Sequence, residues 1–286
     1  MTRTVYVNGD YLPETEAKVS IFDRGFLMGD AVYEVTSVLD GKLIDFEGHK
    51  NRLERSLKEL DMVSPVTMDE LLEIHRELVK LNDIDEGGVY MQISRGADDD
   101  RNFEYPDPEK VKASLVLFTQ KKNLSHAASA DKGYKVISME EIRWGRRDIK
   151  TVQLLGASMA KMAAHKAGAD DAWFVEDGYV TEGSSNNAYI VKDGKIITRQ
   201  LSNKLLAGIT RAAVLRFAAE AQMQIEERLF TIEEAQQADE AFATSATAFV
   251  QPIVEIDGVT LGDGKPGAVA KRLREIYLEE AKNLAV

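Results

Sequence analysis

The chain has 286 residues, of which 44% are hydrophobic and 29% are charged, and its formal net charge is −12. This length suits two medium domains or one large one. The acidic balance excludes general nucleic-acid binding, because no basic surplus exists to neutralise phosphates. The chain has no cysteine, which excludes disulfides, thiol catalysis and cysteine-held metals, and we expect no metal site.

The N-terminal residues 1–6 run directly into a strand pattern, which is not typical of a signal peptide. No apolar run approaches the ~20 residues that a membrane span needs. We therefore expect a cytoplasmic protein that does not act at a membrane.

Pairs of Asn-Gly or Asp-Gly separate several runs of β-forming residues. They are Asn8-Gly9, Asp40-Gly41, Asp177-Gly178, Asp193-Gly194 and Asp257-Gly258. Such pairs indicate hairpins because both central positions tolerate a positive φ. The sequence therefore predicts antiparallel sheet in both halves of the chain.

Helical patterns lie between these strands. The expected helices cover residues 46–62, a segment that starts at the capping box Thr67–Glu70, residues 155–168, residues 209–223, a short segment after Thr231, and residues 266–284. The regular alternation of a doubly wound fold is absent. We expect an α+β protein with a small N-terminal domain (1–123), a polar linker (124–133) and a larger C-terminal domain (134–286).

Two separate segments offer a reactive lysine and a carboxylate. Lys150 is expected where a strand ends and a helix begins, and a lysine that forms a Schiff base needs a partly desolvated site. Glu182 is expected in a polar turn between two buried strands. A carboxylate facing a pyridine nitrogen keeps that nitrogen protonated. Taken alone, a surface lysine and a plain surface turn are the more common explanations.

Two further segments could bind a phosphate. His49 and Arg52 lie on one helix face, and the planar arginine fork can bond two oxygens. Gly208 precedes a helix whose first N–H groups could hold an anion. The alternatives are an exposed arginine that pairs with Asp45 or Glu54, and an ordinary helix start.

Taken in order, five segments resemble the fold-type IV enzymes that use pyridoxal phosphate (PLP). This family includes D-amino-acid transaminases, branched-chain aminotransferases, (R)-amine transaminases and aminodeoxychorismate lyase. The segments are residues 22–34, 49–53, 148–150, 181–186 and 208–211. The match covers nearly the whole chain, and the D-amino-acid branch is the most similar. It implies the two-domain α+β fold of that family and a homodimer.

The resemblance also implies roles for individual residues. Lys150 would carry PLP covalently and move a proton as the catalytic residue. The remaining cofactor contacts would come from Arg52, Glu182, Ser185, Asn186, Ser245 and Thr247 and from the backbone N–H groups of Ile209 and Thr210. Arg52 would bind the phosphate and Glu182 would pair with the pyridine nitrogen. Ala246 stands where the family usually has a phosphate-binding threonine, so Ser245 or Thr247 would have to supply that hydroxyl.

The substrate contacts are expected from Tyr33, Val35, Arg101 and Phe103. The D-amino-acid branch holds the substrate carboxylate with an Arg-x-His pair, and here Phe103 replaces the histidine. We expect transfer from a D-amino acid to 2-oxoglutarate or pyruvate. Alternatives are an (R)-selective amine transaminase or a dual activity, a branched-chain L-amino-acid aminotransferase, and a lyase. A non-catalytic PLP binder would not need both Lys150 and Glu182.

Overall fold

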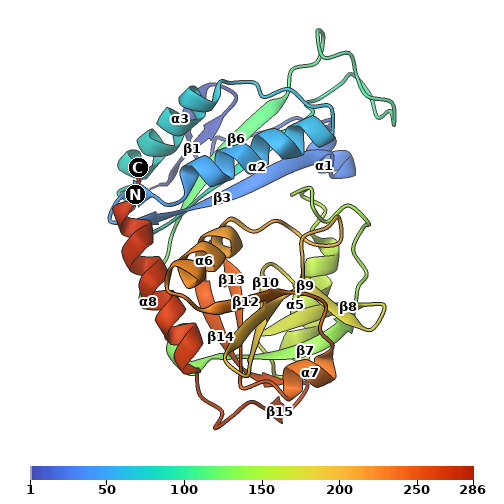
Figure 1. Ribbon diagram of the computed structural model, residues 1–286. Coiled ribbons are helices and arrows are strands. Elements are labelled where there is room, and N and C mark those ends of the chain that lie inside the picture. The colour runs from blue at the N-terminus through green and yellow to red at the C-terminus, as the bar shows by residue number, and fades with distance from the viewer. Residues whose placement is uncertain (1) are drawn as a thin grey trace. The chain divides into compact units, whose positions relative to one another are not determined.

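The computed structural model describes residues 2–286, and the chain divides into two compact units. The first unit holds the residues up to Asn123 together with Ile149–Gln153 and Leu284–Val286. The second holds Leu124–Asp148 and Leu154–Asn283. Each unit has its own sheet and its own helices (Figure 1). The expected domain limits 1–123, 124–133 and 134–286 stay a prediction.

The first unit contains a six-stranded antiparallel sheet with the order β2-β1-β6-β5-β3-β4. Its strands are β1 (Thr4–Val7), β2 (Asp10–Pro13), β3 (Ala31–Leu39), β4 (Lys42–Leu43), β5 (Gly87–Ser94) and β6 (Ser114–Lys121). Its helices are α1 (Arg24–Met28), α2 (Phe46–Glu59) and α3 (Met68–Leu81). The helix α2 packs on β3, while α3 packs on β1, β4, β5 and β6.

Local sequence explains the turns and helix starts of this unit. Asn8 and Gly9 have φ angles of 50° and 112°, as the predicted hairpin between β1 and β2 requires. Thr67 caps α3 by accepting from the Glu70 N–H at 3.2 Å, and the Glu70 carboxylate accepts from the Thr67 N–H at 2.7 Å. The helix α2 ends at Glu59, earlier than predicted, and Asp61 then takes a φ of 50°.

The second unit contains a nine-stranded mixed sheet with the order β12-β11-β10-β13-β14-β7-β8-β9, with β15 beside β14. Three neighbouring pairs are parallel, namely β7 with β8, β7 with β14, and β11 with β12. Its strands are β7 (Tyr134–Glu140), β8 (Asp171–Glu176), β9 (Tyr179–Gly183), β10 (Asn187–Lys192), β11 (Lys195–Thr198), β12 (Gln224–Glu227), β13 (Glu240–Ser245), β14 (Phe249–Ile256) and β15 (Val259–Thr260).

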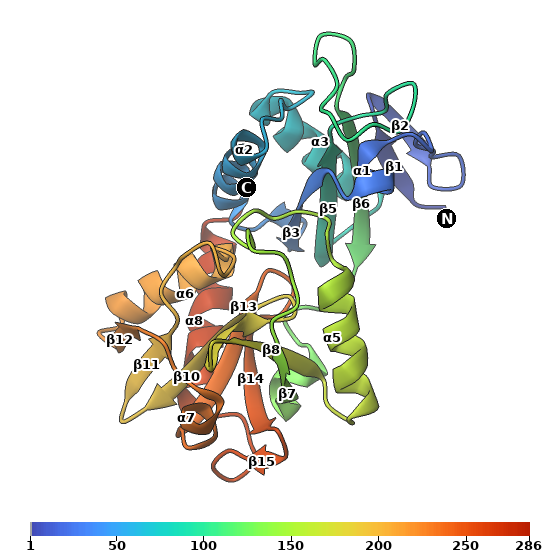
Figure 2. The same cartoon turned by 90° about the vertical axis from the view of Figure 1, so that its right-hand side faces the viewer.

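The helices of the second unit cover this sheet (Figure 2). They are α4 (Ala128–Lys132), α5 (Leu155–Lys166), α6 (Ile209–Glu220), α7 (Ile232–Gln236) and α8 (Ala268–Asn283). Helix α4 lies inside the segment expected as a linker and packs on β14. Trp173 and Phe230, whose ring centroids are 6.2 Å apart, belong to the main apolar cluster.

The remaining predicted turns also form, because each Asp-Gly pair places both residues at positive φ. They connect β3 with β4, β8 with β9, β10 with β11, and β14 with β15. The expected α+β class is confirmed by two units in which helices cover largely antiparallel sheets. Within residues 2–286, no helix has the length and apolar character to cross a membrane.

Candidate active site

Lys150 lies in an irregular segment beside β3, so the prediction of a strand end at this residue is wrong. In this segment Thr151 forms an isolated β-bridge with Val32 of β3. The Thr151 N–H donates to the Ile149 carbonyl at 2.8 Å. This tight turn bends the backbone at Lys150 and stops a strand from forming. Helix α5 begins after the segment, at Leu155.

The expected substrate residues Tyr33 and Val35 lie on β3, and Tyr33 lies beside Lys150. The Lys150 Nζ is 4.1 Å from the centroid of the Tyr33 ring, and the Tyr33 N–H donates to the Lys150 carbonyl at 3.0 Å. Tyr33 and Val35 are half-buried and alternate with buried Glu34 along β3. Alternation puts Tyr33 and Val35 on one face of the sheet and Glu34 on the other. The first unit therefore brings Lys150 and Tyr33 together.

Arg52 is buried and pairs with Glu34, a residue of β3, whereas the sequence alternative was an exposed arginine. Its Nε and Nη2 donate to the Glu34 carboxylate at 2.7 Å and 2.6 Å. His49 Nδ1 lies 2.7 Å from the same carboxylate. Glu34 is 18 residues from Arg52, and only the packing of α2 on β3 brings them together.

The charge of Glu34 is strongly favoured in the folded protein. Burial alone would raise the pKa of its carboxyl, but the charge and hydrogen bonds of Arg52 outweigh burial, with help from His49. Together they lower the pKa of Glu34 to about 2. The bidentate pair fixes the orientation of the Arg52 guanidinium.

Glu182 lies in strand β9, so its expected position in a turn is wrong. The strand continues through Gly183, which pairs with Trp173 of β8, and the turn follows at residues 184–186. Glu182 is 4% exposed. In that turn Ser185 is exposed, while the Asn186 side-chain N–H donates to Asp171 at 2.6 Å.

Donors from three parts of the second unit meet at the Glu182 carboxylate. Arg143 Nη1 donates to its Oε1 at 2.9 Å. The Asn187 side chain and the Leu206 N–H donate to its Oε2 at 3.1 Å and 3.0 Å. The sequence separation of 39 residues between Arg143 and Glu182 hides this pair from sequence reasoning.

Arg143 divides its charge between two carboxylates. Its Nε and Nη2 donate to Glu141 at 2.8 Å and 2.6 Å, which leaves one short contact for Glu182. Burial raises the pKa of Glu182, Arg143 lowers it, and the net direction is upward. The pKa of Arg143 is also raised, because its contacts with the two carboxylates outweigh its own burial. Both upward pKa shifts follow from one arginine that is shared between two carboxylates, so the charge of Glu182 is only partly compensated.

An additional cationic donor would therefore stabilise the charged form of Glu182. A protonated pyridine nitrogen is such a donor. The donor set around this carboxylate thus fits the pyridine ring of PLP.

The N-terminus of α6 lies next to this carboxylate. Gly208 precedes the helix, and no side chain caps the backbone at Ile209 and Thr210. A Cβ at Gly208 would lie 2.1 Å from Asn187 Oδ1, so this close approach requires glycine. The expected helix start is confirmed, and uncapped N–H groups of this kind suit a phosphate.

Strand β13 brings the remaining expected phosphate residues to the same region. Asn187 pairs with Thr244 in the sheet, and α6 packs on β13. Ser245 ends that strand, and Thr247 follows in the next turn, both half-buried. The second unit therefore brings together Glu182, the start of α6 and the end of β13.

Arg101 and Phe103 lie in the irregular segment between β5 and β6, and both are exposed. The Arg101 Cζ is 4.8 Å from the centroid of the Phe103 ring. The arginine therefore rests over the ring that replaces the expected histidine.

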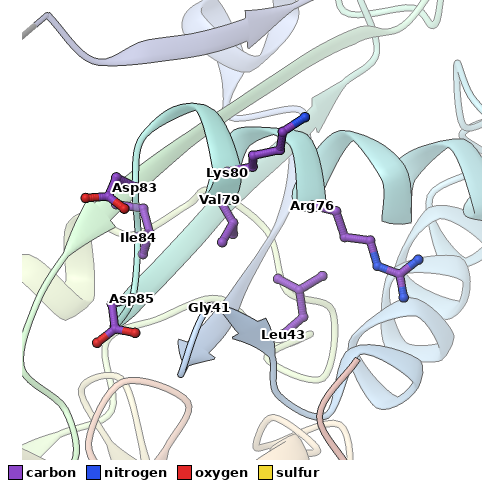
Figure 3. Close-up of a pocket in the computed structure, with 8 residues that line it drawn as sticks. All are labelled: Gly41, Leu43, Arg76, Val79, Lys80, Asp83, Ile84 and Asp85. Carbon is purple, nitrogen blue, oxygen red and sulfur yellow. The ribbon is translucent and has the colours of Figure 1, made fainter.

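A pocket of about 350 Å³ in the first unit contains none of the expected residues (Figure 3). Leu43, Val79 and Ile84 give it an apolar lining, and charged side chains from α3 and the following turn surround them. It is lined by Gly41, Leu43, Arg76, Val79, Lys80, Asp83, Ile84 and Asp85.

Comparison with known proteins identifies the family. The model of the amino-transferase class IV family matches residues 31–256. The chain belongs to the class IV aminotransferases. The expected family, its two-domain fold and the aminotransferase activity are therefore confirmed, and PLP is the cofactor of this class.

The relatives of this class IV aminotransferase carry two kinds of name. A D-alanine aminotransferase from Staphylococcus haemolyticus is 39% identical over 271 residues, which cover 95% of each chain. One from Listeria monocytogenes is 36% identical and covers 96% of this chain and 95% of its own.

Branched-chain aminotransferases are among the solved structures that resemble it. The T.th. enzyme with pyridoxamine 5'-phosphate has a TM-score of 0.90 at 28% identity and covers 100% of this chain and 98% of its own. The Thermoproteus uzoniensis enzyme with norvaline has a TM-score of 0.86 at 26% identity, with 99% and 96% covered.

Replacing Glu34 with glutamine should destabilise the protein by roughly 3 kcal/mol, since it removes the buried carboxylate charge that Arg52 contacts at 2.7 Å and 2.6 Å. The native pair contributes its full stability above the unfolded-state pKa of glutamate, about 4.3, and loses it as the pH falls through the folded value of about 2. Urea unfolding of the cofactor-free proteins should therefore show a difference in the free energy of unfolding between wild type and Glu34→Gln at pH 7. This difference should become smaller below pH ~4. Glu54→Gln, at an exposed position on α2, is the control. An equal stability of Glu34→Gln and wild type at pH 7 would contradict the role of this pair.

Replacing Arg143 with methionine should raise the pKa of Glu182 further, because it removes the short cationic contact at 2.9 Å. A neutral Glu182 holds a protonated ring nitrogen poorly. We expect PLP affinity, measured by fluorescence quenching, to fall about tenfold or more, equivalent to ~1.4 kcal/mol. Arg228→Met is a matched control, because Arg228 also binds two glutamates of this unit. Unchanged affinity in Arg143→Met would show that Glu182 does not depend on this arginine.

Proposed function

We propose that this class IV aminotransferase moves an amino group from a D-amino acid to 2-oxoglutarate or pyruvate. The observation that carries the proposal is the partly compensated Glu182 beside an uncapped helix start, which suits a protonated pyridine with a phosphate. The substrate class is supported by relatives named D-alanine aminotransferase, which span 95% of the chain at up to 39% identity. PLP supplies an aldehyde that exchanges amino groups and a ring that accepts electrons.

Lys150 would hold the cofactor and move the proton of the substrate. As a free amine beside the substrate, Lys150 would be the base that moves this proton. The Tyr33 ring 4.1 Å from its Nζ limits where this amine can lie. The keto acid formed from the donor would leave before the acceptor binds, and the amino group would stay on the enzyme in between, so the kinetics should be ping-pong.

Guanidinium, backbone N–H and hydroxyl groups would hold the phosphate. Arg52 would contribute its guanidinium, in the orientation that Glu34 fixes. The backbone N–H groups of Ile209 and Thr210 would also contribute, with Ser245 or Thr247 as the hydroxyl donor. Ala246 cannot supply a hydroxyl, and a missing hydrogen bond to a charged group costs roughly 1.5–3 kcal/mol.

Ser185 and Asn186 would flank the cofactor ring from the turn after β9. The Asn186 Oδ1 is buried without a partner among the described residues, which makes it available to a ligand. Ser185 is exposed at the tip of the same turn.

Substrate choice would depend on the segment between β5 and β6. Arg101 can bind a carboxylate through its planar fork without help from a histidine. The apolar Phe103 favours a second candidate, an (R)-selective amine transaminase or a dual activity, because a ring there can contact a substrate that lacks a carboxylate. The solved branched-chain aminotransferases, at up to 29% identity, support L-amino acids as a third candidate.

The protein would work as a cytoplasmic homodimer. Helix α5 exposes Leu155, Met159 and Met162, which lie on one face at helical spacing. Such an apolar stripe suits contact with a second copy.

A donor panel tests the proposal. D-alanine, D-glutamate, (R)-1-phenylethylamine and L-leucine would each be offered with 2-oxoglutarate and with pyruvate. We expect turnover with the D-amino acids and none in the Lys150→Ala variant. Turnover restricted to L-leucine would replace this function with the branched-chain one, and near-normal turnover in Lys150→Ala would refute the assigned lysine.

A further inference from the structure

The segment between β5 and β6 has to present Arg101 although it has little structure of its own. It runs from Arg95 to Ala113, contains no helix or regular strand, and extends beyond the sheet (Figure 2). Most residues near Arg101 are exposed. A segment of this length needs anchors to hold one side chain in a fixed place.

Arg24 anchors the segment on both sides of Phe103. Its Nη1 donates to the carbonyl oxygens of Asn102 and Glu104 at 2.5 Å and 3.2 Å. Arg24 itself is 5% exposed, and its Nε donates to Asp30 at 2.7 Å. A buried charge in this position fixes the backbone directly beside Arg101.

A second anchor acts through Tyr105. The Arg95 Cζ lies 3.5 Å from the centroid of the Tyr105 ring, a close cation–π contact. Arg95 also donates to Asp30, through Nε at 2.8 Å and Nη2 at 3.2 Å. The Asp30 carboxylate thus orients both arginines that hold the segment.

The first end of the segment is also fixed at the start of α1, and the second end lies close to it. The Arg24 N–H donates to the Gly96 carbonyl at 2.9 Å, and Asp23 forms a bridge with Ala97. Gly96 has a φ of 95°, and a Cβ there would lie 2.0 Å from the Lys112 carbonyl oxygen, so only glycine lets the ends approach.

We propose that Arg24 and Tyr105 are positioning residues for the substrate carboxylate, because they hold the backbone that presents Arg101 and Phe103. This inference rests on the proposed function. Without the anchors, the segment must be ordered each time a substrate binds, and that entropy loss weakens binding. Neither residue needs to touch the substrate or the cofactor.

Four variants separate anchoring from a general structural role. Arg24→Met and Tyr105→Leu remove the anchors, while Arg24→Lys and Tyr105→Phe keep a charge or a ring. Lys110→Met is the control within the segment, since Lys110 is exposed and pairs with Asp107 in its own turn. Tyr105 is itself 58% exposed, so its replacement leaves the core intact.

Hydrogen exchange of the holoenzyme measures the anchors without relying on activity. We expect the backbone amides of residues 98–105 to exchange about tenfold faster in Arg24→Met. Tyr105→Leu should change exchange in the same direction, while Tyr105→Phe and Lys110→Met should resemble wild type. Exchange that stays at the wild-type rate in both anchor variants would overturn the proposal.

Kinetics test the consequence for the substrate. In both anchor variants KM for D-alanine and for 2-oxoglutarate should rise about tenfold, with kcat within about twofold and PLP affinity unchanged. Arg101→Ala should raise KM without faster exchange. Faster exchange with unchanged KM would overturn the proposal. Absence of D-amino-acid turnover in wild type would instead defeat the proposed function.

Discussion

The candidate active site depends on a buried carboxylate whose negative charge is only partly compensated by the cation beside it. Glu182 is buried in the second unit, and the nearby cation Arg143 gives two of its three short guanidinium contacts to Glu141. Two neutral donors complete the shell, from Asn187 and the Leu206 backbone. A protonated pyridine nitrogen would supply the missing charge, so cofactor binding and the charge of Glu182 would stabilise each other.

The same kind of pair positions side chains elsewhere in the molecule. Glu34 fixes the Arg52 fork from the opposite face of β3, where it does not compete with Tyr33 for space. Asp30 orients Arg24 and Arg95, which in turn hold the segment that carries Arg101. In each case the carboxylate and the arginine come from different elements, so the packing of those elements sets the geometry of the site.

Features governed by neighbouring residues could be predicted from the sequence. The Asp-Gly and Asn-Gly hairpins and the Thr67 capping box depend on contacts within a few residues. The position of Gly208 before α6 was also predictable, because a helix start has a local signature. The roles of Lys150 and Glu182 stay predictions, which rest on residue type and on the family resemblance.

Features that depend on distant contacts could not be predicted. The backbone at Lys150 forms a turn beside β3, and Glu182 extends β9, because pairing with distant strands decides both conformations. Arg143 gave no signal, since its partner lies 39 residues away. The partner of Arg52 was missed for the same reason, as helical spacing pointed only to its neighbours on α2.

One measurement tests the central claim that Lys150 carries the cofactor and that Glu182 keeps its pyridine nitrogen protonated. The holoenzyme would be reduced with borohydride, digested, and mapped by mass spectrometry. The account predicts a single phosphopyridoxyl label on the peptide that contains Lys150. A label on another lysine, or no stable label at all, would contradict it.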